Sequence, residues 1–200
     1  MRLRPLALLV LLVAAGCRRA EEKPAAAAPS APVGPLFAVI ETDRGVIEFE
    51  LLTRDAPKAA ENFRLLAERG FYNGLTFHRI VKGFMLQGGD PKGDGTAGES
   101  AWGGTFADEI APFSMLYQAG AGYKRGIVAM ANRGPNTNSS QFFIVHQDYR
   151  LPPSYTIFGR VTKGMEVVDA IAEVPKSRGA DDDMSKPLQP VVMKRVSIRK

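Results

Sequence analysis

Short extended runs separated by turn residues fill most of the chain beyond residue 36, and this pattern constrains the fold more than any other feature. Two such runs, Phe37–Thr42 and Val46–Leu51, flank Asp43–Gly45, whose Asp-Arg-Gly sequence is typical of a hairpin turn. Helical spacing occurs in only two isolated places, so strands and helices do not alternate as they do in parallel α/β folds. The pattern predicts an antiparallel sheet, closed into a β-barrel with helices at its ends.

Two helices are predicted from apolar residues at helical spacing and from the residues that bound them. Asp55 and Pro57 are typical of a helix start, and the pattern continues to Gly70, so one face of this helix should cover the sheet. A second helix is predicted over Lys163–Val174. Further strands are predicted at Ile127–Ala131, Gln141–Val145, Thr156–Val161 and Val191–Ile198. The acidic run Asp181–Asp183 is expected to be a solvated loop.

The size and composition of the chain indicate one globular domain with tails. It has 200 residues, of which 45% are hydrophobic and 24% are charged, enough to form a sizeable core. Lysine and arginine exceed aspartate and glutamate by 26 to 21, a formal net charge of +5, but the positive residues are scattered and no aromatic ladder lies among them. We therefore expect no binding to nucleic acid.

The first residues of the chain predict an export signal. Arg2 and Arg4 form a basic start, Pro5–Ala15 is an apolar run, and small residues lead to Cys17. A membrane-spanning helix needs about 20 apolar residues, so this run is too short to be one. We predict a bacterial lipoprotein signal peptide over residues 1–16 and lipidation of Cys17, which is the only cysteine and cannot form an intramolecular disulfide. Ordinary secretory cleavage, leaving a free thiol, is the alternative.

Residues 17–35 are predicted to form the lipidated Cys17 and a disordered Ala/Pro-rich tether, because they carry too few large apolar groups to offset the entropy of ordering. The folded domain is predicted over residues 36–200. This arrangement predicts a protein of the bacterial cell envelope, lipid-anchored on the periplasmic side. Arg18 follows the cysteine instead of the Asp associated with inner-membrane retention, which favours the outer membrane over the inner.

The glycine-rich segment Gly88–Ser100 contains two apparent ligand motifs that its context argues against. Its glycines satisfy the G-x-G-x-x-G spacing of a dinucleotide loop, but no helical pattern follows them. Its aspartates faintly resemble a calcium loop, but Lys92 occupies a ligand position and Ala101 stands where the closing Glu should be. His78 and His146 are isolated and are assigned no chemistry. We predict no cofactor and no metal.

The segment Phe77–Asp90 is the strongest candidate for a functional site. Gly83 is a natural turn residue between two extended runs, and a turn there would bring Arg79, Phe84 and Gln87 near one another. These residues would offer hydrogen-bond donors beside an apolar floor, without a nucleophile or paired carboxylates. The alternative is an ordinary β-hairpin that exposes its arginine on the surface.

Four motifs, in this order along the chain, resemble those of the cyclophilin family of peptidyl-prolyl cis/trans isomerases. They are FHRIVKGFMLQGGD from residue 77, GDGTAG from residue 93, MANRGPNTNSSQFFI from residue 130 and YTIFGRV from residue 155. The resemblance covers the folded part of the chain, from about residue 37 to residue 200. It implies a mainly β fold, a closed eight-stranded antiparallel β-barrel capped by two α-helices, with a substrate groove on the outer face of the barrel.

The resemblance also implies a set of site residues, carried over position by position. The catalytic positions are Arg79, Phe84, Gln87 and Asn132. The substrate-binding positions are Met85, Gly95, Ala131, Gln141, Phe143, Leu151 and Tyr155. Two positions depart from the better-known family pattern: Arg150 stands where many cyclophilins have Trp, and Tyr155 stands where they have His.

The implied activity is isomerisation of X-Pro peptide bonds without a covalent intermediate. Rotation about such a bond is slow because amide resonance must be broken, and a guanidinium such as that of Arg79 can stabilise the twisted amide better than the planar one. The expected partners are proline-containing unfolded or flexible polypeptides, and the membrane through the lipid, with the protein itself a monomer. The alternative hypothesis is a non-catalytic peptide-binding or chaperone module on the same fold.

Overall fold

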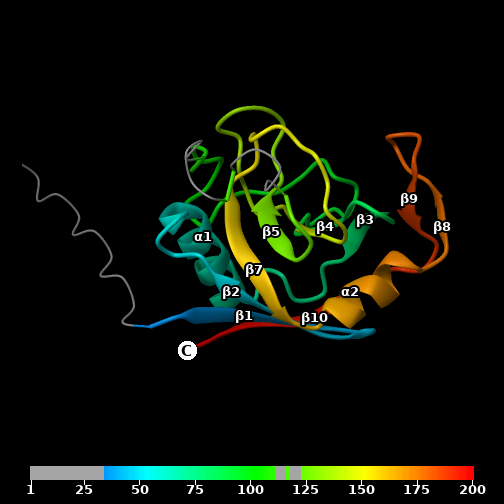
Figure 1. Cartoon of the computed structure of the whole chain (residues 1–200), viewed down its shortest axis with the longest axis horizontal. Helices are drawn as coiled ribbons and strands as arrows, with labels where there is room; N and C mark the ends of the chain where they lie inside the picture. Colours follow the sequence, from blue (N-terminus) through cyan, green and yellow to red (C-terminus); the bar gives the residue numbers. More distant parts are fainter. Residues whose placement is uncertain (1–33, 111–115, 118–122) are drawn as a thin grey trace, which may run out of the picture. The chain divides into compact units, whose positions relative to one another are not determined.

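The computed structural model describes residues 34–110, 116–117 and 123–200. The predicted signal peptide, Cys17 and all but the last two residues of the predicted tether lie outside the described residues. Figure 1 shows a strongly curled sheet with one helix against it and a second helix at one end. The sheet has eight strands in the order β10-β1-β2-β7-β5-β6-β4-β3, and a separate two-stranded hairpin pairs β8 with β9.

Twelve elements follow one another along the described chain. The strands of the main sheet are β1 (Leu36–Thr42), β2 (Gly45–Leu51), β3 (Phe77–Val81), β4 (Met85–Gly88), β5 (Ile127–Met130), β6 (Phe142–Val145), β7 (Ile157–Lys163) and β10 (Met193–Arg199). The helices are α1 (Pro57–Glu68) and α2 (Met165–Ala172), and the hairpin strands are β8 (Lys176–Arg178) and β9 (Met184–Pro187). All the strand pairs of the main sheet are antiparallel, and the first strand, β1, pairs with the last, β10. The antiparallel, mainly β architecture with two helices is therefore as predicted.

The prediction of a closed barrel is wrong in one respect, because the sheet is an open half-barrel. Its edge strands β10 and β3 share no ladder, and their neighbouring segments meet at a single bridge between Thr76 and Val192. Beside this bridge the Phe77 N–H donates to the Val191 carbonyl. The pairing cannot extend further toward β9, because Pro190 has no N–H to contribute to a ladder. The sheet curls strongly without closing.

Helix α1 covers the concave side of the sheet through aromatic packing. Pro57 begins the helix, as predicted, because its fixed φ suits a first turn and its missing N–H would have no partner there. Phe63 is fully buried and packs against the rings of Phe49, Tyr72, Phe142 and Phe158, with centroids 4.7 to 5.6 Å apart. These contacts fix the inner face of the sheet, so the outer face of β4 and β6 is left for a site.

The β8–β9 hairpin was not predicted. Its tip carries Asp181–Asp183, which form an exposed loop as expected, but the flanking strands and their position beside β3 went unforeseen. Neither strand has the apolar alternation that marks a half-buried strand in a sequence. Over the described residues no helix is long and apolar enough to cross a membrane.

Candidate active site

The site is built on one row of side chains that crosses four strands. Arg79 of β3 stands opposite Gln87 of β4, Gln87 opposite Phe143 of β6, and Phe143 opposite Ala129 of β5. Residues directly opposite one another in an antiparallel pair project to the same face. The hairpin predicted from Gly83 is confirmed, since that residue lies in the β3–β4 turn with φ of 83°. The sheet thus places a cation, an amide and an aromatic ring in line.

An apolar pocket lies beside this row. Met85 and Phe143 are almost fully buried, at 1% and 4% exposure, and belong to a second apolar cluster, separate from the core under α1. Phe84 and Tyr155 pack against that cluster, with their ring centroids 6.5 and 5.5 Å from that of Phe143. The other predicted apolar positions, Ala131 and Leu151, pack there as well. The structure therefore brings together every apolar residue predicted for the site.

Arg79 places its guanidinium over the edge of this pocket. Its Nη1 lies 3.8 Å from the Met85 sulfur, and its Cζ lies 6.0 Å from the centroid of the Phe84 ring. The side chain is 29% exposed, so it is partly shielded from water while it keeps access to a bound molecule. The alternative, an ordinary hairpin that exposes its arginine, is not tested by this geometry, and the catalytic role of Arg79 stays a prediction. Its Nε, however, is already engaged, by the Asp181 carboxylate.

The predicted amide residues connect the row to the glycine-rich loop. Gln87 Nε2 donates to Gln141 Oε1 at 2.9 Å, and Gln141 Nε2 donates to the carbonyls of Ala97 at 2.6 Å and Gly95 at 3.1 Å. Gly95 has φ of 84°, a conformation that suits glycine. The two glutamine amides thus fix the loop against the sheet, and Gln87 and Gln141 border a small hollow of about 60 Å³ together with Gly95 and Ala131.

Asn132 lines the same hollow, but its amide serves the neighbouring loops. Its Nδ2 donates to the Ser154 carbonyl at 2.8 Å, and its Oδ1 accepts a weak bond from the Gly134 N–H at 3.4 Å. Its side chain therefore ties the 132–140 loop to the segment before Tyr155. The catalytic role of Asn132 stays a prediction, and its contacts indicate that it shapes the groove wall.

His146 is buried and His78 is partly buried, and the surroundings of both favour the neutral imidazole. Burial lowers the pKa of both His78 and His146 below the ordinary value, and it outweighs the nearby carboxylates that raise it. His146 Nδ1 accepts the Gly83 N–H at 3.0 Å, so it supports the β3–β4 turn. The ring nitrogens of His78 are buried without a hydrogen-bond partner among the described residues. The described residues contain no group of three or more His, Cys, Asp and Glu side chains that could hold a metal ion.

Comparisons with known proteins agree on one family. The family model described as cyclophilin type peptidyl-prolyl cis-trans isomerase/CLD matches residues 37–198. The chain belongs to this family of cyclophilin-type isomerases. A peptidyl-prolyl cis-trans isomerase of Arabidopsis thaliana is 44% identical over 160 residues, 80% of this chain and 93% of the relative. A peptidyl-prolyl cis-trans isomerase-like 1 protein of Neurospora crassa is 49% identical over 140 residues, 70% of this chain and 82% of the relative.

A solved structure shares the cyclophilin fold. The crystal structure of a Cryptosporidium parvum cyclophilin type peptidyl-prolyl cis-trans isomerase has a TM-score of 0.74 and 37% sequence identity, and the match covers 84% of this chain and 99% of the other. The chain is thus a cyclophilin-type peptidyl-prolyl cis-trans isomerase over nearly all of its described length.

The two departures from the better-known cyclophilin pattern differ in their surroundings. Arg150 is exposed and makes no hydrogen bond or ion pair with any residue that the structure describes. Tyr155 is fixed through its backbone: its N–H donates to Tyr123 Oη at 2.9 Å, and its carbonyl accepts bonds from the hydroxyls of Tyr123 and Tyr117. Burial raises the pKa of Tyr117 to about 12, so this hydroxyl stays a donor at neutral pH. Tyr155 therefore belongs to the pocket wall, whereas Arg150 extends into solvent.

Tyr149 is a site residue that sequence reasoning missed. Its ring stacks on Phe84, with the centroids 4.2 Å apart and the planes 28° from parallel. Tyr149 therefore supports the apolar floor from the outside, at the position next to Arg150. The signal in the sequence is only an aromatic residue beside a predicted groove position, which is not specific enough to assign a role.

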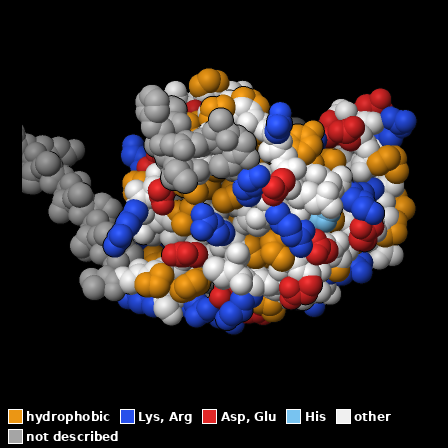
Figure 2. Space-filling model, viewed as in Figure 1, with side chains coloured by type: hydrophobic (Ala, Val, Ile, Leu, Met, Phe, Trp, Pro, Cys, Tyr) orange, Lys and Arg blue, Asp and Glu red, His pale blue; other side chains and the backbone are white. Residues whose placement is uncertain are grey.

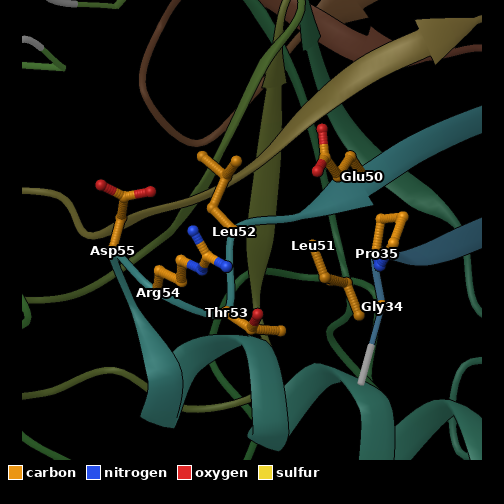
Figure 3. A pocket seen from close by; sticks show the side chains of 8 residues that line it. All are labelled: Gly34, Pro35, Glu50, Leu51, Leu52, Thr53, Arg54 and Asp55. Atoms are coloured by element: carbon orange, nitrogen blue, oxygen red, sulfur yellow. The ribbon is translucent and has the colours of Figure 1, made fainter. Parts of the chain in front are cut away.

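A second hollow on the domain contains none of the predicted site residues. It has a volume of about 420 Å³ and is lined by residues 34–35 and 50–55, at the end of β2 and just before α1. Figure 3 shows its lining side chains, among them Glu50, Arg54 and Asp55. These residues offer no grouping of nucleophile, base or clustered donors that would suggest a second reaction.

Proposed function

We propose that Arg79 catalyses the rotation of an X-Pro bond by stabilising the twisted amide. The position of its guanidinium, at the edge of a pocket floored by Met85 and Phe84, is the observation that carries the proposal. The barrier of about 20 kcal/mol comes from resonance between the amide nitrogen and the carbonyl. As the bond twists, the lone pair localises on the nitrogen and becomes a better acceptor for the guanidinium, so binding favours the transition state over the ground state.

The apolar pocket and the glutamine amides would bind different parts of the substrate. The apolar cluster around Phe143 would grip the prolyl ring, and Gln87 with the loop at Gly95 would hold the backbone on the other side of the bond. One half of the substrate can then rotate against the other while the apolar walls keep water away from the arginine. The Cryptosporidium parvum relative was also crystallised in the presence of the dipeptide Ala-Pro, at a TM-score of 0.73 and 37% identity, which supports a proline-containing ligand.

The cellular role that we propose is assistance to the folding of exported proteins in the bacterial envelope. The basic start, the apolar run and the small residues before Cys17 support a lipoprotein signal, and residues 17–35 would tether a monomeric domain to the membrane. Arg18 favours the outer membrane over the inner one. A lipid on Cys17 and a disordered tether would let the groove reach flexible chains near the membrane surface.

Arg79→Ala tests the mechanism. Loss of a charge-assisted hydrogen bond in a partly desolvated site costs about 1.5 to 3 kcal/mol, so the value of kcat/KM should fall about 10- to 100-fold with the fold intact. Arg79→Lys is the matched control: it keeps the charge but loses the planar fork, and it should recover only part of the activity.

Isomerisation should be measured by NMR exchange on a proline-containing peptide, together with peptide affinity. Wild-type rates in a folded Arg79→Ala variant would remove Arg79 from the mechanism. If wild-type protein binds the peptide without accelerating its isomerisation, the alternative of a non-catalytic peptide-binding or chaperone module replaces the proposal.

A further inference from the structure

The carboxylate of Asp181 holds the proposed catalytic arginine. Asp181 Oδ2 accepts a hydrogen bond of 2.5 Å from Arg79 Nε, across 102 positions of the sequence. Asp183 Oδ2 lies 4.0 Å from Arg79 Nη2, and these two are the only carboxylates among the described residues that pair with Arg79. The β8–β9 hairpin, which stands beside β3 in Figure 1, therefore brings acidic groups to the back of the guanidinium.

Asp181 is itself fixed in place by the hairpin. Its Oδ1 accepts a bond of 2.8 Å from the hydroxyl of Ser185, which is 2% exposed, and a longer one of 3.3 Å from the Asp183 N–H. A Cβ at Gly179 would collide with the Ser185 hydroxyl and approach the Asp181 carboxylate to 2.8 Å, so a larger residue there would displace these two side chains. Burial raises the pKa of Asp181, but the bonds from Arg79 and Ser185 more than offset this and leave the pKa below its ordinary value. The carboxylate is therefore ionised at neutral pH.

The contact divides the donors of Arg79 between two faces. The Nε is bound to the hairpin, whereas Nη1 faces the pocket beside the Met85 sulfur. The guanidinium is planar, so fixing the Nε edge restricts the direction in which Nη1 can point. A free arginine side chain samples many rotamers, and a catalytic group held in a productive orientation gains by not having to order itself in each turnover.

We propose that Asp181 is a positioning residue for this isomerase, acting through Arg79 and fixed by Ser185. The proposal rests on the proposed role of Arg79. The hairpin also closes one side of a hollow of about 260 Å³ whose other lining includes His78 and Gly95, so it lies against the groove while remaining outside the prolyl pocket. Figure 2 shows side chains of both charges at the outer end of the hairpin, consistent with its acidic tip and the neighbouring basic residues.

The experiment compares Asp181→Asn and Asp181→Ala with a matched control, Asp182→Asn, which removes the charge and suits the positive φ of 61° at this position. At position 181, Asn keeps the size of the side chain and can still accept the hydrogen bond from Ser185. Asp181→Asn therefore separates the effect of losing the charge from the effect of disrupting the hairpin structure. Asp182 lies in the same loop, is 87% exposed at its side chain and pairs only with Arg178 among the described residues. The readouts are kcat and KM on a proline-containing peptide, the Nε–H signal of Arg79 by NMR, and the melting temperature.

Both Asp181 variants should lower kcat by about 3- to 10-fold with KM changed less than 2-fold, because an unrestrained arginine is less often in the productive orientation. The Nε–H signal of Arg79 should shift and exchange faster, while Asp182→Asn behaves as wild type. In an Arg79→Ala background, Asp181→Ala should cost nothing more, since a residue that acts through Arg79 has nothing left to position.

Three results would overturn the inference: wild-type or faster kcat in Asp181→Asn, an unchanged Nε–H signal, or a further loss in the Arg79→Ala background. If Arg79→Ala is slow but Asp181→Asn is not, only the positioning role is lost. If Arg79→Ala itself keeps wild-type activity, the proposed mechanism fails first, and the two failures are distinguished.

Discussion

Replacing Tyr149 with alanine should weaken substrate binding without slowing the rotation step. The ring of Tyr149 stacks on that of Phe84, whose centroid also lies 6.0 Å from Arg79 Cζ and 6.5 Å from the centroid of Phe143. A stacked aromatic pair contributes about 0.5 to 1.5 kcal/mol beyond its buried area. If substrate binding loses this whole contribution, KM should rise about 2- to 13-fold. The value of kcat should stay within 2-fold, because Tyr149 makes no hydrogen bond with Arg79 in the part of the chain that the structure describes.

Tyr149→Phe is the matched control, because stacking needs the ring and the Tyr149 hydroxyl makes no hydrogen bond with the residues that the structure describes. It should keep a KM within 2-fold of wild type. The measurement is the steady-state rate of a protease-coupled assay over a range of peptide concentrations, with the melting temperature as a check on folding. A wild-type KM in Tyr149→Ala, or an equal loss in Tyr149→Phe, would contradict the argument that the stacked ring supports the floor.

Three further predictions concern other parts of the chain. Burial lowers the pKa of His78 and His146, so below a pH of about 6.5 the unfolded chain binds protons at these residues that the folded chain does not. The free energy of unfolding should therefore have its full value above a pH of about 6.5 and fall as the pH drops below it. Thermal unfolding between pH 5 and pH 8, flattened in a variant that replaces both histidines with glutamine, checks this, and an unchanged pH dependence in that variant would contradict it. Inhibition by the family's apolar macrocyclic ligand cyclosporin should be weak, because Arg150 offers a hydrated cation where many cyclophilins have Trp. In an inhibitor titration, Arg150→Trp should strengthen cyclosporin binding by about 1 to 3 kcal/mol. Nanomolar inhibition of the wild type would refute this prediction. Cys17→Ser should abolish lipid attachment, which membrane fractionation and the intact mass would report. The isolated domain from residue 36 should catalyse isomerisation of a proline-containing peptide without the tether. An unchanged membrane fraction for Cys17→Ser would argue against the anchor.

Local patterns predicted the elements that carry most of the site. Gly83 between two extended runs was enough to foresee the β3–β4 hairpin, and the pairing of Arg79 with Gln87 follows from it. The helix beginning at Pro57 was likewise marked by its terminal residues. The role of each side chain came from the resemblance to a family and could not come from periodicity alone, because spacing predicts which face a residue occupies and leaves its chemistry open.

Contacts between residues far apart in the chain could not be predicted from the sequence. The bond between Arg79 and Asp181 joins a strand to a loop 102 positions away, and an acidic run predicts only a preference for solvent. The short hairpin strands β8 and β9 carry no apolar alternation, so no local sequence pattern predicts them. Whether the sheet closes depends on a few hydrogen bonds around Thr76 and Val192, which no pattern of hydrophobic residues can specify.

The pairing of the first strand with the last brings distant ends of the domain together. Phe37 of β1 stands opposite Arg199 of β10, so the two ends of this ladder lie side by side. A short turn linking these positions would convert the pair into an ordinary hairpin, and new termini could then be opened in an exposed loop away from the groove. The domain is therefore suited to circular permutation, and its isomerase site could be inserted as one continuous module into a loop of another protein.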